Sequence, residues 1–381
     1  MELPPPSLPS PPPPPFLLTL ALALVAASAA TTQVCIIGSG IAGSSLSHFL
    51  HHHRPPSAVA AIHSSIFEIS PSVGGRMSTV SIAGAVFESG ASIIHHMNLH
   101  ASSFVETLNL TPQSKDSSSS SSYFGVWDGR RFVFRSLPPP SESDWSLYRR
   151  FLHPIVDDLR IFWRYGFSLL RMRVFVGNML RRFMRYYEGV EDRPVFESVE
   201  EMLRWSGLYG LTQRTLREEL VDVELSERFI SELVTAYFGF TLASEVPDLV
   251  GTVESPDLPF SCVAVQKKIS EDDKVYKIFS RSPLEDNLLD KIFSTRKETI
   301  RINWAAYPHF EAPEVFAPFV LDDFHLYYIN AFENAASTIE TGAVAAENVA
   351  RLILSRLHNQ SPDVQELRIP TSEEEKLHLD L

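Results

Sequence analysis

The sequence has little cysteine, and this limits the chemistry that the chain can carry. Cys35 and Cys262 are the only two cysteines among 381 residues. Two thiols cannot build the disulfide framework of a small secreted domain. Cys35 stands inside a predicted strand, where a cysteine usually serves as a small buried hydrophobe. The sequence therefore excludes a disulfide scaffold and predicts no catalytic thiol.

The chain also lacks excess positive charge and long apolar runs. Its formal net charge is −13 at pH 7, which argues against a nucleic acid as the partner. The apolar stretch from Phe16 to Ala27 is too short to span a bilayer comfortably. The 44% hydrophobic and 21% charged content is that of a globular protein, and the length allows two domains.

Residues 1–29 are predicted to be a secretory signal peptide. The apolar stretch ends in Ala27-Ser28-Ala29, the small-x-small pattern of a cleavage site. The residues before Phe16 include no Lys or Arg, so a disordered proline-rich leader is the alternative. Sequons at Asn109 and Asn359 fit a secreted or endomembrane protein.

A glycine turn follows the first apolar, β-branched run. Gly38, Gly40 and Gly43 match G-x-G-x-x-G. The first glycine makes the tight turn, the second lets a pyrophosphate approach the backbone, and the third lets helix pack on strand. A helix N-terminus after the turn offers free N–H groups to phosphates. We expect a dinucleotide site here, with a plain βαβ unit as the alternative; its residues are Gly38, Ser39, Gly40, Ile41, Ala42 and Gly43.

Glu68 supports the dinucleotide prediction. It stands at the carboxyl end of a second apolar run, SSIFEIS, where an acidic side chain accepts hydrogen bonds from ribose hydroxyls. Its spacing from Gly43 is slightly longer than the usual value of about 20 residues, which a longer helix and loop explain. The order strand, helix, strand predicts an α/β fold with a Rossmann-like parallel sheet.

Arginine without lysine marks a helix-rich segment in the middle of the chain. Between Arg149 and Arg185 stand nine Arg and no Lys against two Asp. A helix of this kind can lie in a membrane interface, with arginine stems reaching toward headgroups. The alternative is a helical layer over the core with a solvated basic face. The apolar residues interleaved with the arginines are Phe162, Trp163, Phe167, Leu170, Phe175 and Met184.

Other segments have simpler patterns. The polar stretch 111–122 predicts a flexible surface loop. A helical run from Glu197 to Val234 shows capping signals and i, i+3, i+4 apolar spacing. SCVAVQKK and KVYKIFSR predict strands separated by an acidic turn. Near the C-terminus, the short β-prone run LYYIN leads to a helix with many small residues, which allow a planar ligand to come close.

Three elements together resemble the flavin amine-oxidase-like superfamily: the glycine turn with Glu68, the sequence PSVGGRMSTV from Pro71 to Val80, and the C-terminal strand, turn and helix. Gly74-Gly75-Arg76 looks like that superfamily's second phosphate-proximal motif, and FESGA at 87–91 resembles the turn that reaches the flavin. The resemblance implies FAD as the cofactor. It adds these expected cofactor-binding residues: Gly75, Arg76, Gly90, Ala91, Glu333 and Thr338.

Within that superfamily, FESGASIIHHMN, WAAYPHFEAPEVF and YYINAFENAAST resemble the prenylcysteine oxidase family, called farnesylcysteine lyase in plants. The resemblance covers nearly all of the chain after the leader. It implies an FAD-dependent oxidoreductase that cleaves a prenylated cysteine with O₂ to cysteine, a prenyl aldehyde and hydrogen peroxide. A role in prenylated-protein degradation and a location in the lysosome, vacuole or other endomembranes follow as expectations.

The expected architecture is a Rossmann-like FAD-binding domain, a parallel sheet with helices, and a mixed substrate domain with a helical cap. We predict this division: 1–29 as the signal peptide, 30–135 as the N-terminal part of the FAD-binding domain with the loop at 111–122, 136–235 as the helical cap and substrate region, 236–300 as substrate-domain strands and helix, 301–357 as the C-terminal part of the FAD-binding domain, and 358–381 as a polar tail.

The chain departs from the family at one place. SELVT, Ser231 to Thr235, runs almost directly into AYFGF, where the family has a long block with strands of both sheets. Losing strands exposes edges and opens the core. A shortened FAD-binding form without activity is therefore an alternative, and a flavin amine oxidase-like enzyme is another.

The implied chemistry oxidises the allylic carbon next to sulfur, after which water adds and the product splits into thiol and aldehyde. It needs positioning and dryness more than a strong general base, so the catalytic residues stay unknown. His95 and His96, which follow the FESGAS turn, are weak candidates. No metal site is expected, because the consecutive His51, His52 and His53 do not share a helical face.

Overall fold

The computed structural model describes residues 31–53, 61–90, 94–111, 123–128, 130–135, 159–189, 192–234, 248–252, 259–270, 272–303, 305–322 and 325–359. The predicted signal peptide, nearly all of the Ser-rich loop and Ala91 lie outside the described residues.

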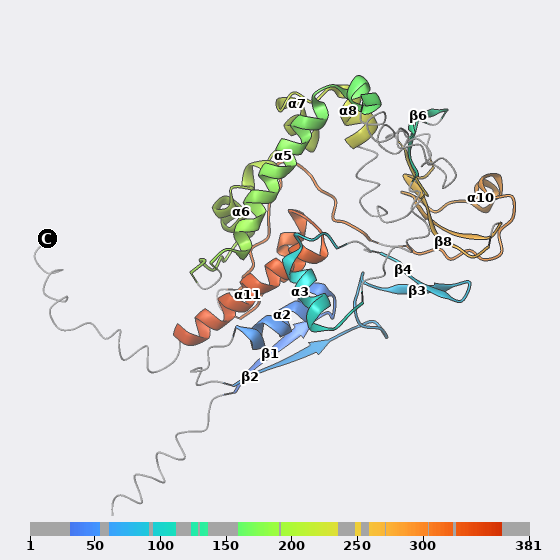
Figure 1. The fold of residues 1–381 in the computed structure, drawn as a ribbon. Helices are drawn as coiled ribbons and strands as arrows, with labels where there is room; N and C mark the ends of the chain where they lie inside the picture. Colours follow the sequence, from blue (N-terminus) through green and yellow to red (C-terminus); the bar gives the residue numbers. More distant parts are fainter. Residues whose placement is uncertain are drawn as a thin grey trace, which may run out of the picture.

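The glycine turn joins a strand to a helix, as predicted. Strand β1 (Thr31–Ile37) lies parallel to β2 (Ala61–Phe67), and helix α2 (Ile41–His52) lies between them in the sequence and covers one face of the pair (Figure 1). The apolar side of α2, with Phe49 and Leu50, is buried. Parallel strands joined through a helix form a Rossmann-like unit, which confirms the α/β fold class.

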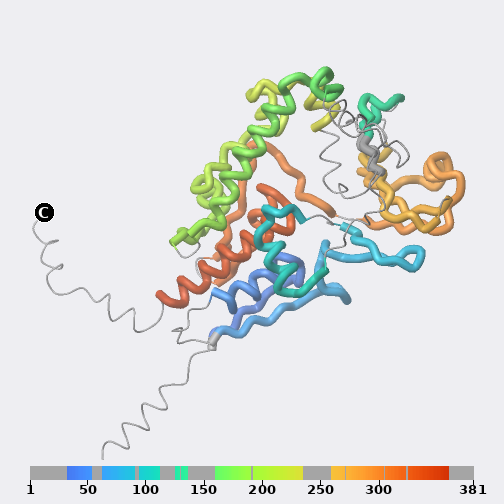
Figure 2. The backbone as a smooth tube through the Cα atoms, in the orientation of Figure 1, coloured from blue at the N-terminus to red at the C-terminus, as the bar shows by residue number. Residues whose placement is uncertain are grey.

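Helix α11 (Ile339–Asn359) comes from the far end of the sequence and packs against α2 and α3 (Leu99–Thr107). Figure 2 shows the red C-terminal helix beside the blue N-terminal unit. Small residues allow this approach: Ala346 is fully buried, and a Cβ at Gly342 would lie 3.1 Å from Cγ2 of Ile41. The core around the glycine turn therefore depends on both halves of the chain.

A buried asparagine ties the next helices to this core. The side-chain oxygen of Asn348 accepts a hydrogen bond from the Phe196 N–H at 3.0 Å, and its amide donates to the Phe196 carbonyl at 2.9 Å. Helix α6 (Val199–Ser206) starts just beyond, with Ser198 and Glu201 forming a capping box. The reciprocal bonds satisfy buried polar groups and fix where the helical layer meets α11.

The helical layer runs along the outer side of the molecule, drawn mostly in green in Figure 1. It starts with helical residues 159–165 and α5 (Ser168–Phe183). Buried side chains that include Tyr165, Leu220 and Phe229 hold it together. The other elements of the layer are η1 (Met184–Tyr187), η2 (Tyr209–Thr212), α7 (Leu216–Asp222), α8 (Glu227–Phe229) and the π-helix η3 (Ile230–Val234).

A second sheet has the strand order β6, β5, β7, β8, β9. β5 and β7 are parallel, and the other neighbours are antiparallel. The predicted division places 30–135 and 236–300 in different domains. The sheet joins strands from both ranges, because β5 and β6 belong to it. The bounds are β5 (Tyr123–Trp127), β6 (Phe132–Arg135), β7 (Asp248–Thr252), β8 (Cys262–Lys268) and β9 (Lys274–Phe279), with α10 (Asp286–Ile292) after them and a separate hairpin of β3 (Thr79–Ile82) and β4 (Ala85–Glu88).

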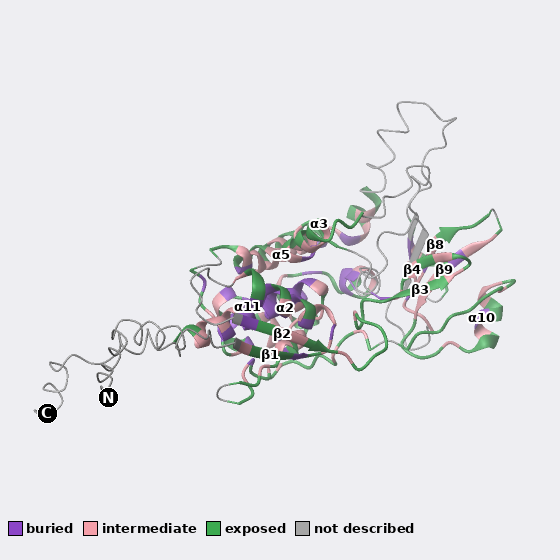
Figure 3. Cartoon of the chain, turned by 90° about the horizontal axis from the view of Figure 1, so that it is seen from below, coloured by how far each residue is buried: buried purple, intermediate pink, exposed green. Residues whose placement is uncertain are grey.

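One face of the β1–β2 pair is open to solvent, and the prediction that Cys35 is buried is wrong. The thiol is exposed, and Ile37 on the same face is 91% exposed. Ile36 on the opposite face is buried beneath α2 and α11. Figure 3 shows the purple core between the helices and green along the strands. A strand is buried on both faces only where elements cover both faces, and the described elements cover one.

The run LYYIN does not form the expected strand. Tyr327 makes an isolated bridge with Val320, and the chain then enters the 3₁₀-helix η4 (Ile329–Asn334). The Tyr328 N–H donates to the Phe319 carbonyl at 2.8 Å. No further strand lies alongside within the described residues, so local 3₁₀ hydrogen bonds take over.

Candidate functional site

The glycine turn has the geometry that its three glycines predict. Gly38 has φ of +96°, in the region that favours glycine. A Cβ at Gly43 would lie 2.1 Å from the Gly38 carbonyl oxygen, so no side chain fits between turn and helix. A Cβ at Gly40 would meet no heavy atom within 4 Å. The turn is therefore tight beneath the helix and open on the side where a phosphate would approach.

Helix α2 begins at this open side without a side-chain cap. Gly40 is its N-cap residue, and no side chain accepts a hydrogen bond from the first turn. The exposed backbone N–H groups and the positive end of the helix dipole favour an anion there. Ile41 and Ala42 lie in that first turn and present backbone rather than polar side chains.

Glu68 reaches the glycine turn directly. Its Oε2 accepts hydrogen bonds from the Ser39 N–H at 2.8 Å and from the Ser39 hydroxyl at 2.6 Å, while its Oε1 accepts from the Ser70 N–H at 2.9 Å. These bonds lower the pKa of Glu68 to about 2, the Ser39 hydroxyl bond being the largest cause. The carboxylate is thus held ionised beside the turn, ready to accept from hydroxyl donors.

The second glycine motif meets the first. Gly74 and Gly75 have φ of +111° and +60°, and a Cβ at Gly75 would lie 3.4 Å from the Gly40 Cα. The Gly74 N–H donates to the Ser39 hydroxyl oxygen at 3.3 Å. Two segments separated by more than thirty residues in the sequence therefore build one backbone surface.

Arg76 links this surface to the C-terminal part of the chain. Its guanidinium forms an ion pair with Glu333 and donates to the Ala306 carbonyl at 2.9 Å and to the Ser337 hydroxyl at 3.1 Å. The Ser337 hydroxyl donates in turn to Glu333 at 2.7 Å. Thr338 caps α11, because its hydroxyl accepts from the Thr341 N–H at 3.0 Å. The structure thus brings together residues predicted from both ends of the sequence.

Lys277 of β9 holds the turn that follows β4. Its ammonium donates to the carbonyls of Glu88 and Gly90, each at 3.1 Å, and lies over the Phe279 ring. Burial lowers the pKa of Lys277. Gly90 itself is buried. The lysine therefore connects the FESGA turn to the second sheet, a role that the sequence did not reveal.

The two histidine candidates lie on the surface. His95 and His96 are exposed, and their ring centroids are 4.1 Å apart. The His95 Nδ1 accepts a hydrogen bond from the Met97 N–H at 3.2 Å, which suits a turn-forming role. A catalytic role for either residue stays a prediction.

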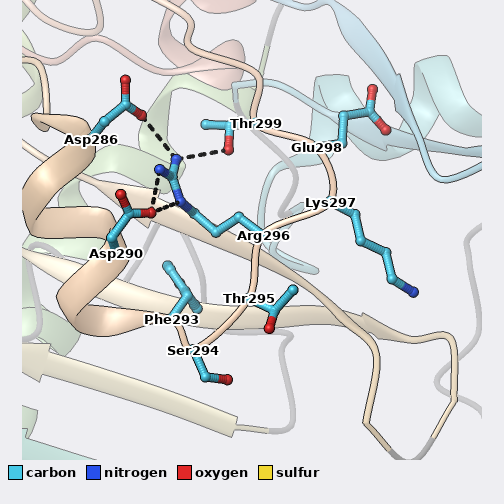
Figure 4. A pocket seen from close by; sticks show the side chains of 9 residues that line it. All are labelled: Asp286, Asp290, Phe293, Ser294, Thr295, Arg296, Lys297, Glu298 and Thr299. Carbon is cyan, nitrogen blue, oxygen red and sulfur yellow. Dashed lines mark hydrogen bonds and ion pairs between the residues drawn. The ribbon is translucent and has the colours of Figure 1, made fainter.

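A separate pocket lies beside α10, at the edge of the second sheet (Figure 4). Arg296 dominates it and forms ion pairs with Asp286 at 3.0 Å and Asp290 at 2.6 Å. Figure 4 shows Asp286 and Asp290 turned toward Arg296, which already occupies both carboxylates, while Lys297 and Glu298 point away. The open backbone of the glycine motifs is the better candidate site.

Two family models match the chain. A model of the NAD(P)-binding Rossmann-like domain matches residues 36–108, which include both glycine motifs. The model of the prenylcysteine lyase family matches residues 151–238 and 231–366. The chain belongs to the prenylcysteine lyase family. The resemblance drawn from the sequence is thereby confirmed, and so is the dinucleotide-binding type of the N-terminal fold.

Relatives of known activity agree with this membership in the prenylcysteine lyase family. Farnesylcysteine lyase of Arabidopsis thaliana is 38% identical over 446 residues, covering 85% of this chain and 88% of that protein. Prenylcysteine oxidase 1 of Bos taurus is 24% identical over 473 residues, with the same two coverages. A redesigned putrescine oxidase overlaps 52% of this chain with a TM-score of 0.28 and 16% identity, too little to support an argument.

The comparisons also agree with a missing interior block. The family model matches in two stretches that meet at 231–238, next to SELVT. The alignment with the plant protein spans 446 residues, more than the 381 of this chain. The plant protein therefore has residues that find no counterpart here.

Proposed function

We propose that the chain is an FAD-dependent thioether oxidase that cleaves farnesylcysteine or a related prenylcysteine with O₂. The observation that carries the proposal is the single surface built by the two glycine motifs, Glu68, and the Arg76–Glu333 pair, in a chain of the prenylcysteine lyase family. Its open side takes a pyrophosphate, and the carboxylate beside it suits a ribose.

The reaction balances with O₂ and water as co-reactants. The C–S bond of the prenylcysteine breaks, the carbon next to sulfur is oxidised to an aldehyde, cysteine leaves as a thiol, and O₂ is reduced to hydrogen peroxide. Bound FAD supplies the two-electron acceptor for the carbon next to sulfur. The residues of the chain bind and orient the reactants and exclude water, which lowers the barrier by holding the reacting atoms together.

Different residues hold different parts of the cofactor. The Gly38–Gly43 turn and the start of α2 hold the pyrophosphate, and Glu68 exchanges its hydroxyl donor Ser39 for a ribose hydroxyl. Arg76 and Glu333 hold the C-terminal segment against the second glycine motif. Lys277 fixes the carbonyls of the FESGA turn. Membership in the prenylcysteine lyase family supports FAD over NAD, because cleavage with O₂ needs a flavin to pass electrons to oxygen.

We also propose a location in the secretory pathway, in the lysosome, vacuole or another endomembrane compartment. Both predicted glycosylation sites, Asn109 and Asn359, are exposed. Asn109 lies in the turn after α3 with φ of 50°. Contact with a membrane surface by the Arg-rich helical segment is a further part of the proposal.

The open face of the β1–β2 pair favours a second candidate, a shortened form that folds and binds FAD without turnover. Ile37 and Phe67 stand exposed where further elements would cover a complete sheet. A flavin amine oxidase-like activity would use the same binding residues and differ in the substrate that reduces the flavin.

The test is the visible spectrum of the full chain, purified from a secretory host. Flavin absorbance that bleaches on anaerobic addition of farnesylcysteine, and returns with air, establishes both cofactor and activity. Bleaching by a polyamine instead establishes the amine oxidase reading. A yellow protein that neither substrate bleaches identifies the inactive FAD-binding form, and a colourless protein contradicts FAD binding.

A further inference from the structure

The Arg-rich helical segment has a second apolar side that nothing in the described residues covers. One side packs inward: Tyr165 is buried, and Met172 and Phe175 pack against the same cluster. On the other side Trp163 is 86% exposed, and Phe167 and Leu170 are exposed as well. An amphipathic surface helix normally shows one apolar stripe and one polar face, so this outward apolar side needs a separate explanation.

Exposed aromatic side chains meet across a break in the helical segment and form the centre of a patch. Gly166, with φ of +58°, separates helical residues 159–165 from α5. The rings of Phe162 and Phe167 meet across this break, with centroids 5.6 Å apart. We call the patch the outer apolar face; its exposed residues are Leu159, Phe162, Trp163, Phe167, Leu169, Leu170 and Val174.

The charge around this face is of one sign. Residues 159–187 include seven Arg and no Lys, Asp or Glu, in a chain whose net charge is −13. Two of these arginines are neutralised from outside the segment, Arg164 by Glu232 at 2.7 Å and Arg171 by Glu224 at 2.7 Å. The segment therefore keeps excess positive charge beside large apolar side chains.

Within the described residues, several other arginines donate to uncharged oxygens, which do not neutralise their charge. Arg182 donates to the Gly207 carbonyl at 3.0 Å, Arg185 to the Trp205 carbonyl at 2.6 Å, and Arg181 to the Asn178 side chain at 3.0 Å. Arg173 is exposed on α5. Tryptophan, phenylalanine and leucine beside arginine are the residues that lie at the boundary between headgroups and acyl chains.

We propose that the outer apolar face docks on the surface of an anionic lipid bilayer. The positive segment complements anionic headgroups, and the aromatic and leucine side chains enter the interface. Within the parts of the chain that the structure describes, no helix is long and apolar enough to cross a membrane, so the contact is with the surface. The inference deepens the proposed function, since a prenyl substrate partitions into lipid, but the binding itself requires neither FAD nor substrate.

Vesicle co-sedimentation of the full chain tests the docking. The probe is phosphatidylcholine vesicles with and without about 30% phosphatidylserine, at low and physiological salt. We expect binding to the anionic vesicles that weakens with salt, together with quenching of tryptophan fluorescence by brominated lipid. Wild-type protein that stays in the supernatant with both vesicles overturns the proposal.

Matched variants distinguish binding through this face from nonspecific binding to vesicles. Replacing Trp163, Phe167 and Leu170 by Ser should weaken binding at least tenfold, because the variant lacks three apolar side chains that enter the lipid. The control replaces Leu108, Val315 and Leu321, exposed on other elements, by Ser and should bind as wild type. Arg173→Gln should weaken binding to anionic vesicles about fivefold. Equal binding by the first variant and wild type overturns the proposal.

Sedimentation velocity without lipid distinguishes the other occupant of such a face, a second copy of this chain. A dimer that the Trp163, Phe167 and Leu170 variant abolishes would show that protein covers the face, and would overturn the docking on lipid. Circular dichroism of each variant verifies folding, so that lost binding is read only from folded protein. Flavin content and bleaching are measured separately, so a failure of the proposed function leaves this result interpretable.

Discussion

The two faces of the β1–β2 pair differ sharply. The face toward α2 and α11 is packed by Ile36, Leu50 and the small residues of α11, whereas the other face exposes Cys35 and Ile37. The glycine turn lies at the end of the same strands, and its Ser39 bonds to Glu68 and Gly74 in the segment that follows β2. The comparison teaches that the turn keeps its hydrogen bonds although the described elements cover only one face of the β1–β2 pair.

The largest expected loss in the free energy of unfolding comes from replacing a buried charged residue of the packed face. Arg193 has no exposed side-chain surface and donates to Glu347 of α11 at 2.8 Å. Burial by itself raises the pKa of Glu347, but hydrogen bonds from His100 and His53 bring it below its usual range. Arg193→Met removes a buried guanidinium from that carboxylate, leaves it only the His53 and His100 contacts, and should cost about 3–5 kcal/mol.

Urea unfolding followed by circular dichroism measures the Arg193→Met effect. The control is Glu200→Ala, which breaks the exposed pair between Glu200 and Arg204 and should leave the midpoint unchanged. Equal midpoints for Arg193→Met and wild type would contradict the assigned role of the buried pair.

Apolar truncations on the two faces sharpen the comparison directly. Leu50 has no exposed surface, so Leu50→Ala should lower the free energy of unfolding by about 2–5 kcal/mol. Ile37 is 91% exposed, so Ile37→Thr should change it by less than about 0.5 kcal/mol. Thermal or urea melts of both variants decide the matter. Similar losses would show that the open face is covered in solution.

Gly43 tests whether the turn is as tight as its geometry indicates. A Cβ there would lie 2.1 Å from the Gly38 carbonyl, so Gly43→Val should cost about 1–3 kcal/mol and remove flavin from the purified protein. The control is Gly177→Ala in α5, where a Cβ meets nothing within 4 Å; it should keep flavin and gain about 0.4–1 kcal/mol. Flavin absorbance and melting temperature report both outcomes.

The smallest expected effect is a change in the pH dependence of stability. Glu68 has its pKa lowered from 4.5 to about 2 by its hydrogen bonds, so its contribution to stability is complete above 4.5 and is lost as pH falls toward 2. Between about pH 6 and pH 3, wild-type urea midpoints should therefore fall more than those of Glu68→Gln. Parallel curves for the two proteins would refute the linkage.

The sequence predicted the geometry of the glycine turn well, because its determinants are local. Gly38, Gly40 and Gly43 specify their turn by backbone conformation and close packing, which need no distant partner. Lys277 escaped prediction because its partners, the carbonyls of Glu88 and Gly90, lie on another element. Two other lysines of the same sheet, Lys267 and Lys268, are exposed at the end of β8.

The predictions that differ from the structure share one physical origin: strand burial and strand pairing depend on which other elements lie alongside. Cys35 was predicted to be buried on the pattern of β1 alone, but burial of a strand depends on what covers each face. LYYIN has β-forming residues, yet only an isolated bridge forms because no strand continues the ladder among the described residues. β5 pairs with β7, which brings β5 and β6 into the sheet of β7 to β9, and local sequence does not contain this choice of a distant partner.

The contact between His53 and Glu347, at 3.2 Å, joins residues 294 positions apart in the sequence. At about 5–20 residues per second of synthesis, roughly 15–60 seconds pass between the emergence of α2 and that of α11. During this interval Phe49 and Leu50 lack the cover that α11 provides. The first segment to be synthesised is therefore among the last to reach its final structure, and a chaperone that shields α2 until translation ends would set the yield of folded protein.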